Sequence, residues 1–243
     1  MLTAFAQTNV GKTRSVNQDT IFASTEVLGP LSNLFIVADG MGGHKGGDIA
    51  SREAIEHFNT YVRDCTDVSD DGILDLMTSA IRAANAGVFS RAADDDELSG
   101  MGTTMTACTV FGGKYYIVHI GDSRAYRITD EAIVQLTNDH SYVNEMVRAG
   151  QLTQNEAREH PKRNVLTRVL GINEEMSADG YVFEAEPGSV ILLCSDGLFN
   201  MVQEDEIKHI VNTSDDPAVT LVETANDRGG TDNISVIVIN ING

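Results

Sequence analysis

Cysteine and basic side chains are both scarce in this sequence of 243 residues. The three cysteines, Cys65, Cys108 and Cys194, are far apart and odd in number, which argues against a disulfide framework and against paired zinc ligands. Lys and Arg number 17 against 36 Asp and Glu, a formal net charge of −19. Because affinity for phosphate backbones and anionic membranes comes from basic residues, we expect neither a nucleic-acid nor a membrane partner.

Long apolar runs are missing as well. The longest, at residues 34–38, 190–194 and 234–239, are far shorter than the roughly 20 residues that cross a bilayer. The first residues lack the basic start and the apolar stretch of a signal peptide. Together with the cysteine usage, these absences predict a cytoplasmic protein.

The sequence does contain many short segments rich in β-branched and aromatic residues. They predict strands at residues 2–8, 20–25, 34–38, 103–111, 115–120, 124–128, 133–136, 181–184, 190–194 and 234–241. Apolar residues at three- and four-residue intervals predict helices at 48–62, 73–90, 142–149, 153–159, 204–211 and 217–226. Strands and helices come in blocks, and no linker divides the chain. This order favours a single α+β domain, residues 1–243, with antiparallel sheets.

Five aspartates stand at the ends of predicted strands. Asp39, Asp122 and Asp196 follow apolar strands, whereas Asp19 and Asp232 precede them. In an antiparallel sheet the end of one strand lies beside the start of its neighbour, so all five are expected on one rim. Hard divalent ions relieve the repulsion among such carboxylates. Two of these ions can activate a water and hold a phosphoryl group for in-line attack.

Other phosphate chemistries fit the sequence less well. The glycine-rich residues 40–47 (GMGGHKGG) match neither nucleotide-binding fingerprint. None of the cysteines is followed six residues later by Arg, so a thiolate phosphatase is not expected. Ser195 lies in CSDG, which is not the nucleophile elbow of serine hydrolases. Chemistry by a metal-activated water remains.

Six segments occur in a recognisable order along essentially the whole chain. They are RSVNQD at 14–19, VADGMGGHKGG at 37–47, MGTT at 101–104, HIGDSRAYR at 119–127, LLCSDGL at 192–198 and GGTDNISVIV at 229–238. This ordered set resembles the metal-dependent Ser/Thr protein phosphatases of type 2C in their compact bacterial form. The resemblance implies a central antiparallel β-sandwich flanked by helices on both faces, a four-layer αββα arrangement. It also implies two Mn²⁺ or Mg²⁺ ions at one end of the sandwich.

The resemblance also implies metal-binding roles for individual residues. Asp39 would bridge the two ions, and the carbonyl of Gly40 would bind one of them. Asp196 and Asp232 would each bind a metal directly. Asp19 would act through a coordinated water.

Two further roles follow from the same resemblance. Arg14 would bind phosphate, because its planar fork suits two phosphoryl oxygens. Asp122 would belong to a third metal site that shares Asp196. The position that holds a proposed general-acid His in many eukaryotic relatives is Met41 here. His44 is a candidate general acid nearby; the alternatives are that it only shapes the loop, or that a metal-bound water protonates the leaving group.

The implied activity is hydrolysis of phosphoserine and phosphothreonine in proteins by direct attack of a metal-bridging hydroxide. Phosphorylated proteins would be the substrates, and a cognate Ser/Thr kinase would be the opposing enzyme. Residues 138–171 resemble the family's flap beside the active site. Two rival hypotheses are a non-catalytic phosphoprotein-binding module, which degenerate metal aspartates would indicate, and a two-metal nuclease, which the formal charge of −19 disfavours.

Overall fold

Two antiparallel sheets packed face to face form the centre of the computed structural model, which describes residues 2–43, 46–69, 72–186 and 188–241. One sheet has the order β1-β11-β10-β7-β8, formed by Leu2–Asn9, Ile234–Ile241, Val190–Cys194, Arg124–Ile128 and Ile133–Gln135. The other has the order β2-β3-β5-β6-β9, formed by Asp19–Ser24, Leu34–Met41, Met105–Phe111, Lys114–Ile120 and Asp179–Glu184. The short β4 (Gly102–Thr103) extends this second sheet by pairing with β3.

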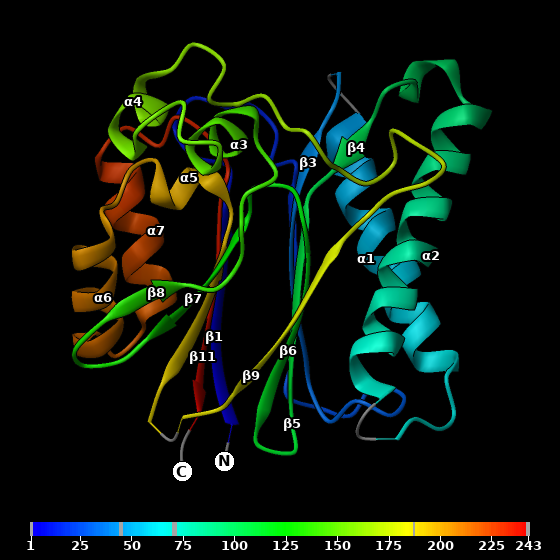
Figure 1. Cartoon of the computed structure of the whole chain (residues 1–243), viewed down its shortest axis with the longest axis horizontal. Helices are drawn as coiled ribbons and strands as arrows, with labels where there is room; N and C mark the ends of the chain where they lie inside the picture. The colour runs from blue at the N-terminus through cyan, green and yellow to red at the C-terminus, as the bar shows by residue number, and fades with distance from the viewer. Residues whose placement is uncertain (1, 44–45, 70–71, 187, 242–243) are drawn as a thin grey trace.

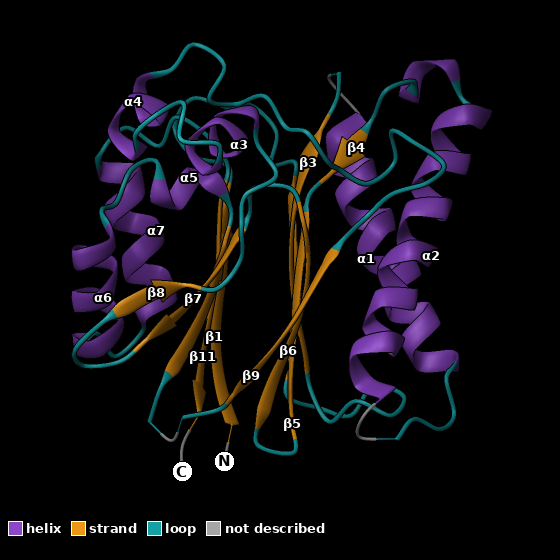
Figure 2. Cartoon of the chain, in the orientation of Figure 1, coloured by secondary structure: helices purple, strands orange, loops and turns teal. Residues whose placement is uncertain are grey.

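Helices cover the outer face of each sheet (Figures 1 and 2). Helices α1 (Gly46–Asp64) and α2 (Ile73–Asp94) pack on the β2–β9 sheet, and a 3₁₀ turn (Asp96–Leu98) follows them. Helices α6 (Glu204–Thr213) and α7 (Pro217–Asp227) pack on the other sheet. This arrangement confirms the expected four-layer αββα fold. None of the helices in the described part of the chain is long and apolar enough to cross a bilayer.

Three apolar clusters fill the spaces between these four layers. The alternation along β11 shows how one strand serves two of them: Val236 and Val238 face α6 and α7, whereas Ile237 and Ile239 face the opposite sheet. A strand covered on both faces needs apolar side chains at every position, which explains why its sequence lacks the usual polar alternation.

The remaining helices lie together at one end of the sandwich (Figure 1). They are α3 (Tyr142–Arg148), α4 (Gln154–Glu159) and the single-turn α5 (Asp196–Phe199). The first two belong to residues 138–171, the segment predicted to be a flap. Two features differ from the sequence expectations: α5 lies where no helix was predicted, and the strand expected at 103–111 is interrupted at Thr104.

Candidate active site

The five aspartates singled out from the sequence all lie at this end of the sandwich. Asp19 and Asp39 are directly opposite one another in the β2–β3 pair. Asp122 follows β6, Asp196 is the first residue of α5 directly beyond β10, and Asp232 precedes β11. The antiparallel order of the strands therefore brings together carboxylates that are as much as 213 residues apart in the sequence, the separation of residues 19 and 232.

A cavity of about 610 Å³ opens between these carboxylates. Its wall includes four of the five aspartates together with two other predicted site residues: Asp39, Asp122, Asp196, Asp232, Arg14 and Gly40. Asp19 is only 6% exposed and lies behind the wall. Residues 164–167 and 169 of the predicted flap line the same cavity, as do Ile172 and Asn173 just beyond it.

The carboxylates strongly perturb one another. Burial, followed by the negative charges of Asp19 and Asp196, raises the pKa of Asp39 well above its usual range. Burial also raises the pKa of Asp122 to about 7 and that of Asp19 to about 6. Burial and the charge of Asp122 likewise raise the pKa of Asp196. A cluster in which burial and like charges oppose ionisation is one in which bound cations are strongly stabilising.

Asp19 supplies a more direct indication that something else binds here. Its Oδ2 accepts a hydrogen bond of 2.7 Å from the hydroxyl of Ser195. Its Oδ1 is buried and has no hydrogen-bond partner among the described residues. A buried carboxylate oxygen without a partner is costly, and a hard cation or a water bound to one would satisfy it.

The carboxylate oxygens of these aspartates suit a hard cation that keeps part of its hydration shell. Among the described residues, no three His, Cys, Asp or Glu side chains form a ready-made cage around one point. Mg²⁺ retains several waters and is bound through one or two carboxylates, so a spread-out set of aspartates suits it. The oxygen ligands disfavour zinc, whose structural sites are closed tetrahedra of thiolate and imidazole.

Gly40 is required by close packing. A Cβ at this position would collide with the carbonyl oxygens of Gly47 and Gln18. The backbone of β3 can therefore approach the start of α1 only without a side chain here. The close approach leaves the end of β3, with Asp39 and the Gly40 backbone, at the cavity wall.

Thr103 and Thr104 have a structural role, which their contacts define. The hydroxyl of Thr104 accepts a hydrogen bond of 3.0 Å from the backbone N–H of Asp39 and also bonds the hydroxyl of Ser123 at 2.7 Å. The hydroxyl of Thr103 donates to the Asp39 carbonyl at 2.9 Å. The interruption between β4 and β5 thus fixes the backbone of Asp39 from both sides.

The loop that carries Arg14 is held in place by a side chain that the sequence analysis did not single out. Asn233, next to Asp232, accepts a hydrogen bond of 2.8 Å from the backbone N–H of Gln18. Its amide nitrogen donates to the carbonyls of Val10 and Val16 at 2.9 and 3.0 Å. One side chain therefore holds both ends of the loop that carries Arg14. The adjacency of Asn233 to a predicted ligand was the only sequence signal for this role.

The positions of the described histidines limit which of them could serve as the general acid. His44 lies outside the described residues. In the described part of the chain, no imidazole lines the cavity. Burial lowers the pKa of His119 to about 4, and its ring lies 4.9 Å from that of His140. Met41, 36% exposed, stands at the cavity wall without a proton to donate.

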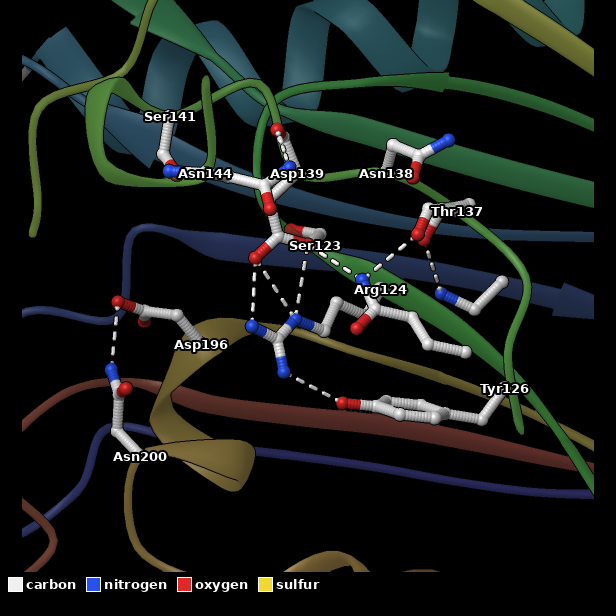
Figure 3. Close-up of polar contacts among 12 residues, drawn as sticks. Ser123, Arg124, Tyr126, Thr137, Asn138, Asp139, Ser141, Asn144, Asp196 and Asn200 are labelled. Carbon is white, nitrogen blue, oxygen red and sulfur yellow. Dashed lines mark hydrogen bonds and ion pairs between the residues drawn. The ribbon is translucent and has the colours of Figure 1, made fainter. Parts of the chain in front are cut away.

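Beside the cavity, Arg124 connects three segments (Figure 3). Its Nε and Nη2 donate to the carboxylate of Asp139, with Nη2 at 2.7 Å from Oδ2, and its Nη1 donates to the hydroxyl of Tyr126 at 2.8 Å. The guanidinium carbon lies 3.7 Å from the ring centroid of Phe199. Arg124 thus joins the start of the predicted flap to α5, the helical turn that begins with Asp196.

Known proteins share this architecture and sequence. The sequence profile described as Protein phosphatase 2C matches residues 7–231. Protein phosphatase PhpP of Streptococcus pneumoniae is 38% identical over 239 residues, which cover 97% of this chain and 96% of that one. The crystal structure of the Mycobacterium tuberculosis serine/threonine phosphatase PstP/Ppp has a TM-score of 0.89 and 33% identity, covering 100% of this chain and 99% of that chain.

A further solved structure contains metal. The catalytic domain of the serine threonine protein phosphatase PstP, in complex with two manganese ions, has a TM-score of 0.87 and 32% identity, covering 100% of this chain and 99% of that chain. The profile match and the full-length relatives agree with the six ordered motifs. The chain belongs to the protein phosphatase 2C family.

Proposed function

We propose that this chain is a metal-dependent protein phosphatase that hydrolyses phosphoserine and phosphothreonine in proteins, and that it opposes a cognate Ser/Thr kinase. The observation that carries the proposal is the cluster of five aspartates at one end of the sandwich. Four of them line one cavity, and a buried oxygen of the fifth, Asp19, has no partner among the described residues. The names of the relatives, which are protein phosphatases, support the same substrate class.

Two Mn²⁺ or Mg²⁺ ions are proposed to bind between the aspartates, Asp39 being shared by both. Gly40 would contribute its carbonyl, Asp196 and Asp232 a carboxylate each, and Asp19 a hydrogen bond to coordinated water. A third ion would be held by Asp122 together with Asp196. When bound, such ions lower the pKa of water to give a nucleophile at neutral pH and neutralise charge on the phosphoryl group.

The residues of this chain perform the remaining tasks. Arg14 lies on the cavity wall and is half exposed, so its guanidinium can turn from Asp232 to two phosphoryl oxygens. Thr104 and Asn233 hold the backbone of Asp39 and the Arg14 loop in place. The substrate phosphorus is attacked directly, without a phosphoenzyme. The proton for the leaving alkoxide comes either from water or from His44.

The proposal is tested with purified protein, Mn²⁺, an aryl phosphate and a phosphothreonine peptide. We expect hydrolysis of both, abolished by a chelator and by Asp39→Asn, which removes the charge shared between the two ions. A supercoiled plasmid in the same buffer should remain intact. Hydrolysis of neither phosphate compound, or nicking of the plasmid, contradicts the proposal. His44→Ala with unchanged activity and pH profile would remove His44 from consideration as general acid.

A further inference from the structure

A second cavity, of about 980 Å³, opens beside the candidate active site. It lies between α3 and α4 of the predicted flap on one side and α5 with the start of α6 on the other. Its lining shares five residues with the first cavity: Arg14, Asp122, Asn164, Asp196 and Asp232. The two cavities are therefore continuous. A phosphorylated side chain that reaches these residues brings its neighbouring residues to the mouth of the second cavity.

The facing walls of this groove carry apolar side chains. Val143, Val147 and Ala157 line the flap side, and Phe199, Met201 and Val202 line the opposite side. Val143, Ala157 and Val202 are buried, 1–8% exposed. Val147, Phe199 and Met201 are only partly buried, so these three present apolar surface to whatever enters the groove.

Charge does not dominate the outer part of the groove. The lining includes two basic side chains, Arg158 and Arg163, and two acidic ones, Glu159 and Glu204. Arg124 also lines the groove, but it is paired with Asp139. The outer groove therefore has balanced charge, and its apolar side chains lie among uncharged polar ones such as Gln154 and Gln203. The apolar patch on the two walls favours an apolar side chain over a strongly acidic or basic one.

Both walls are held by one ion pair, so the groove exists before anything binds. Phe199 on one wall packs against the guanidinium of Arg124. Asp139 and Tyr126 fix that guanidinium in place (Figure 3). On the other wall, the side chain of Asn144 in α3 donates to the carbonyl of Asp139 at 2.7 Å. Because the walls are already ordered, little binding free energy is lost in ordering them when a ligand binds.

We propose that this groove binds a large apolar side chain of the substrate polypeptide, close in sequence to the phosphorylated residue. The inference rests on the proposed phosphatase function and deepens it, because it names a feature of the substrate beyond the phosphate. The occupant is the substrate chain itself, since the groove begins at the residues where the phosphate binds. Burial of a Leu or Phe side chain there raises kcat/KM about tenfold or more over Ser at the same position.

The test is a set of phosphothreonine peptides in which each flanking Ser is replaced in turn by Leu or Lys, with Mn²⁺ present throughout. The wild type is expected to prefer Leu at one flanking position. Val147→Asp places a carboxylate on the flap wall, so the preference at that position should change from Leu to Lys. Met201→Asp should change the same position from the opposite wall. The ratio of kcat/KM between two peptides within one variant cancels any general loss of activity.

The matched control is Val134→Asp. Val134 in β8 is 43% exposed and lines neither cavity, so this variant should keep the wild-type Leu-to-Ser ratio. The inference is overturned if phosphopeptides are hydrolysed without a preference for Leu at any flanking position, or if Val147→Asp keeps the ratio of Val134→Asp. An aryl phosphate separates the two proposals: if neither it nor the peptides are hydrolysed, both fail.

Discussion

Arg14 and Asp232 are joined by a hydrogen bond of 2.7 Å from Nη2 to Oδ2. The proposed phosphate ligand is therefore paired with a proposed metal ligand. Hydrogen bonding to Asp232 and the charge of that carboxylate raise the pKa of Arg14, so the guanidinium stays charged throughout the physiological range. A cation that binds Asp232 would compete with Arg14, and the freed guanidinium would become available to phosphate.

Arg14→Ala should consequently have opposite effects on substrate and metal. Loss of the guanidinium should lower kcat/KM for an aryl phosphate about 10- to 100-fold, since a charged hydrogen bond contributes about 1.5–3 kcal/mol. Mn²⁺ affinity should rise by up to about fivefold, because an exposed ion pair worth at most about 1 kcal/mol no longer competes. Steady-state kinetics and titration calorimetry measure the two effects. Weaker Mn²⁺ binding in the variant would contradict the competition.

The pH dependence of metal-free stability follows from the raised carboxyl pKa values. In the window from about 4 to 7 the folded protein binds more protons at Asp19 and Asp122 than the unfolded chain does. Ionisation of these two carboxyls, together with Asp39 and Asp196, therefore lowers the stability as pH rises through that window, and it outweighs the opposite contribution of His119, whose pKa is lowered to about 4. For Asp19 alone, a pKa raised from 3.8 to about 6 corresponds to a loss on the order of 3 kcal/mol.

Thermal melting in chelator should show a lower Tm at pH 8 than at pH 5, and added Mn²⁺ should raise Tm more at pH 8 than at pH 5. Asp19→Asn should make the profile recorded in chelator less steep, because one of the groups responsible no longer ionises. A metal-free Tm that rises steadily from pH 5 to pH 8 would contradict this account.

Gly40 offers a test of the packing at the end of β3. In Gly40→Ala the new methyl group meets the carbonyl oxygens of Gly47 and Gln18, so either β2 or α1 must move. We expect a loss of about 2–4 kcal/mol in the free energy of unfolding, together with weaker Mn²⁺ binding. Gly43→Ala is the control, because a Cβ there has no atom within 4 Å. Urea unfolding that shows equal costs for the two variants would refute the packing argument.

The sequence predicted those parts of this fold and site that depend on local pattern. Strand polarity placed Asp19, Asp39 and Asp232 at one end before any contact was known. The supporting contacts could not be predicted in this way: Ser195 reaches Asp19 across 176 positions and Asn233 reaches Gln18 across 215. Pairing over such separations is decided by how the two sheets pack, which periodicity does not encode.

The interruption of the strand at Thr104 and the helical turn at Asp196 are the two local features that the strand and helix patterns did not predict. Thr104 leaves the strand pattern because its backbone N–H and its hydroxyl both bond the backbone of Asp39. Asp196 begins a helical turn in which the side chain of Asn200 donates to its carboxylate at 3.1 Å (Figure 3). At Thr104 a tertiary contact overrides the local preference of the sequence, whereas the contact at Asp196 is local, between residues four positions apart.

Arg124 provides the sharpest stability prediction, because the same strand carries a matched control. Arg124 and Asp139 have side chains 21% and 10% exposed, and their pair is bidentate. Arg124→Lys keeps the charge but loses the fork, the bond to Tyr126 and the packing on Phe199. We expect a loss of about 2–4 kcal/mol in the free energy of unfolding, because one partner of a buried pair is left poorly satisfied.

Arg127→Lys, also in β7, is the control. Arg127 pairs with Glu186, whose side chain is 53% exposed, so replacing it should cost less than about 1 kcal/mol. The double variant Arg124→Lys, Asp139→Asn should lose less unfolding free energy than the sum of the two single losses, because each single substitution breaks the same interaction. Urea unfolding of the four variants decides the matter. If Arg124→Lys costs no more than Arg127→Lys, Arg124 does not hold the predicted flap to α5, and the groove between them must be formed by other contacts.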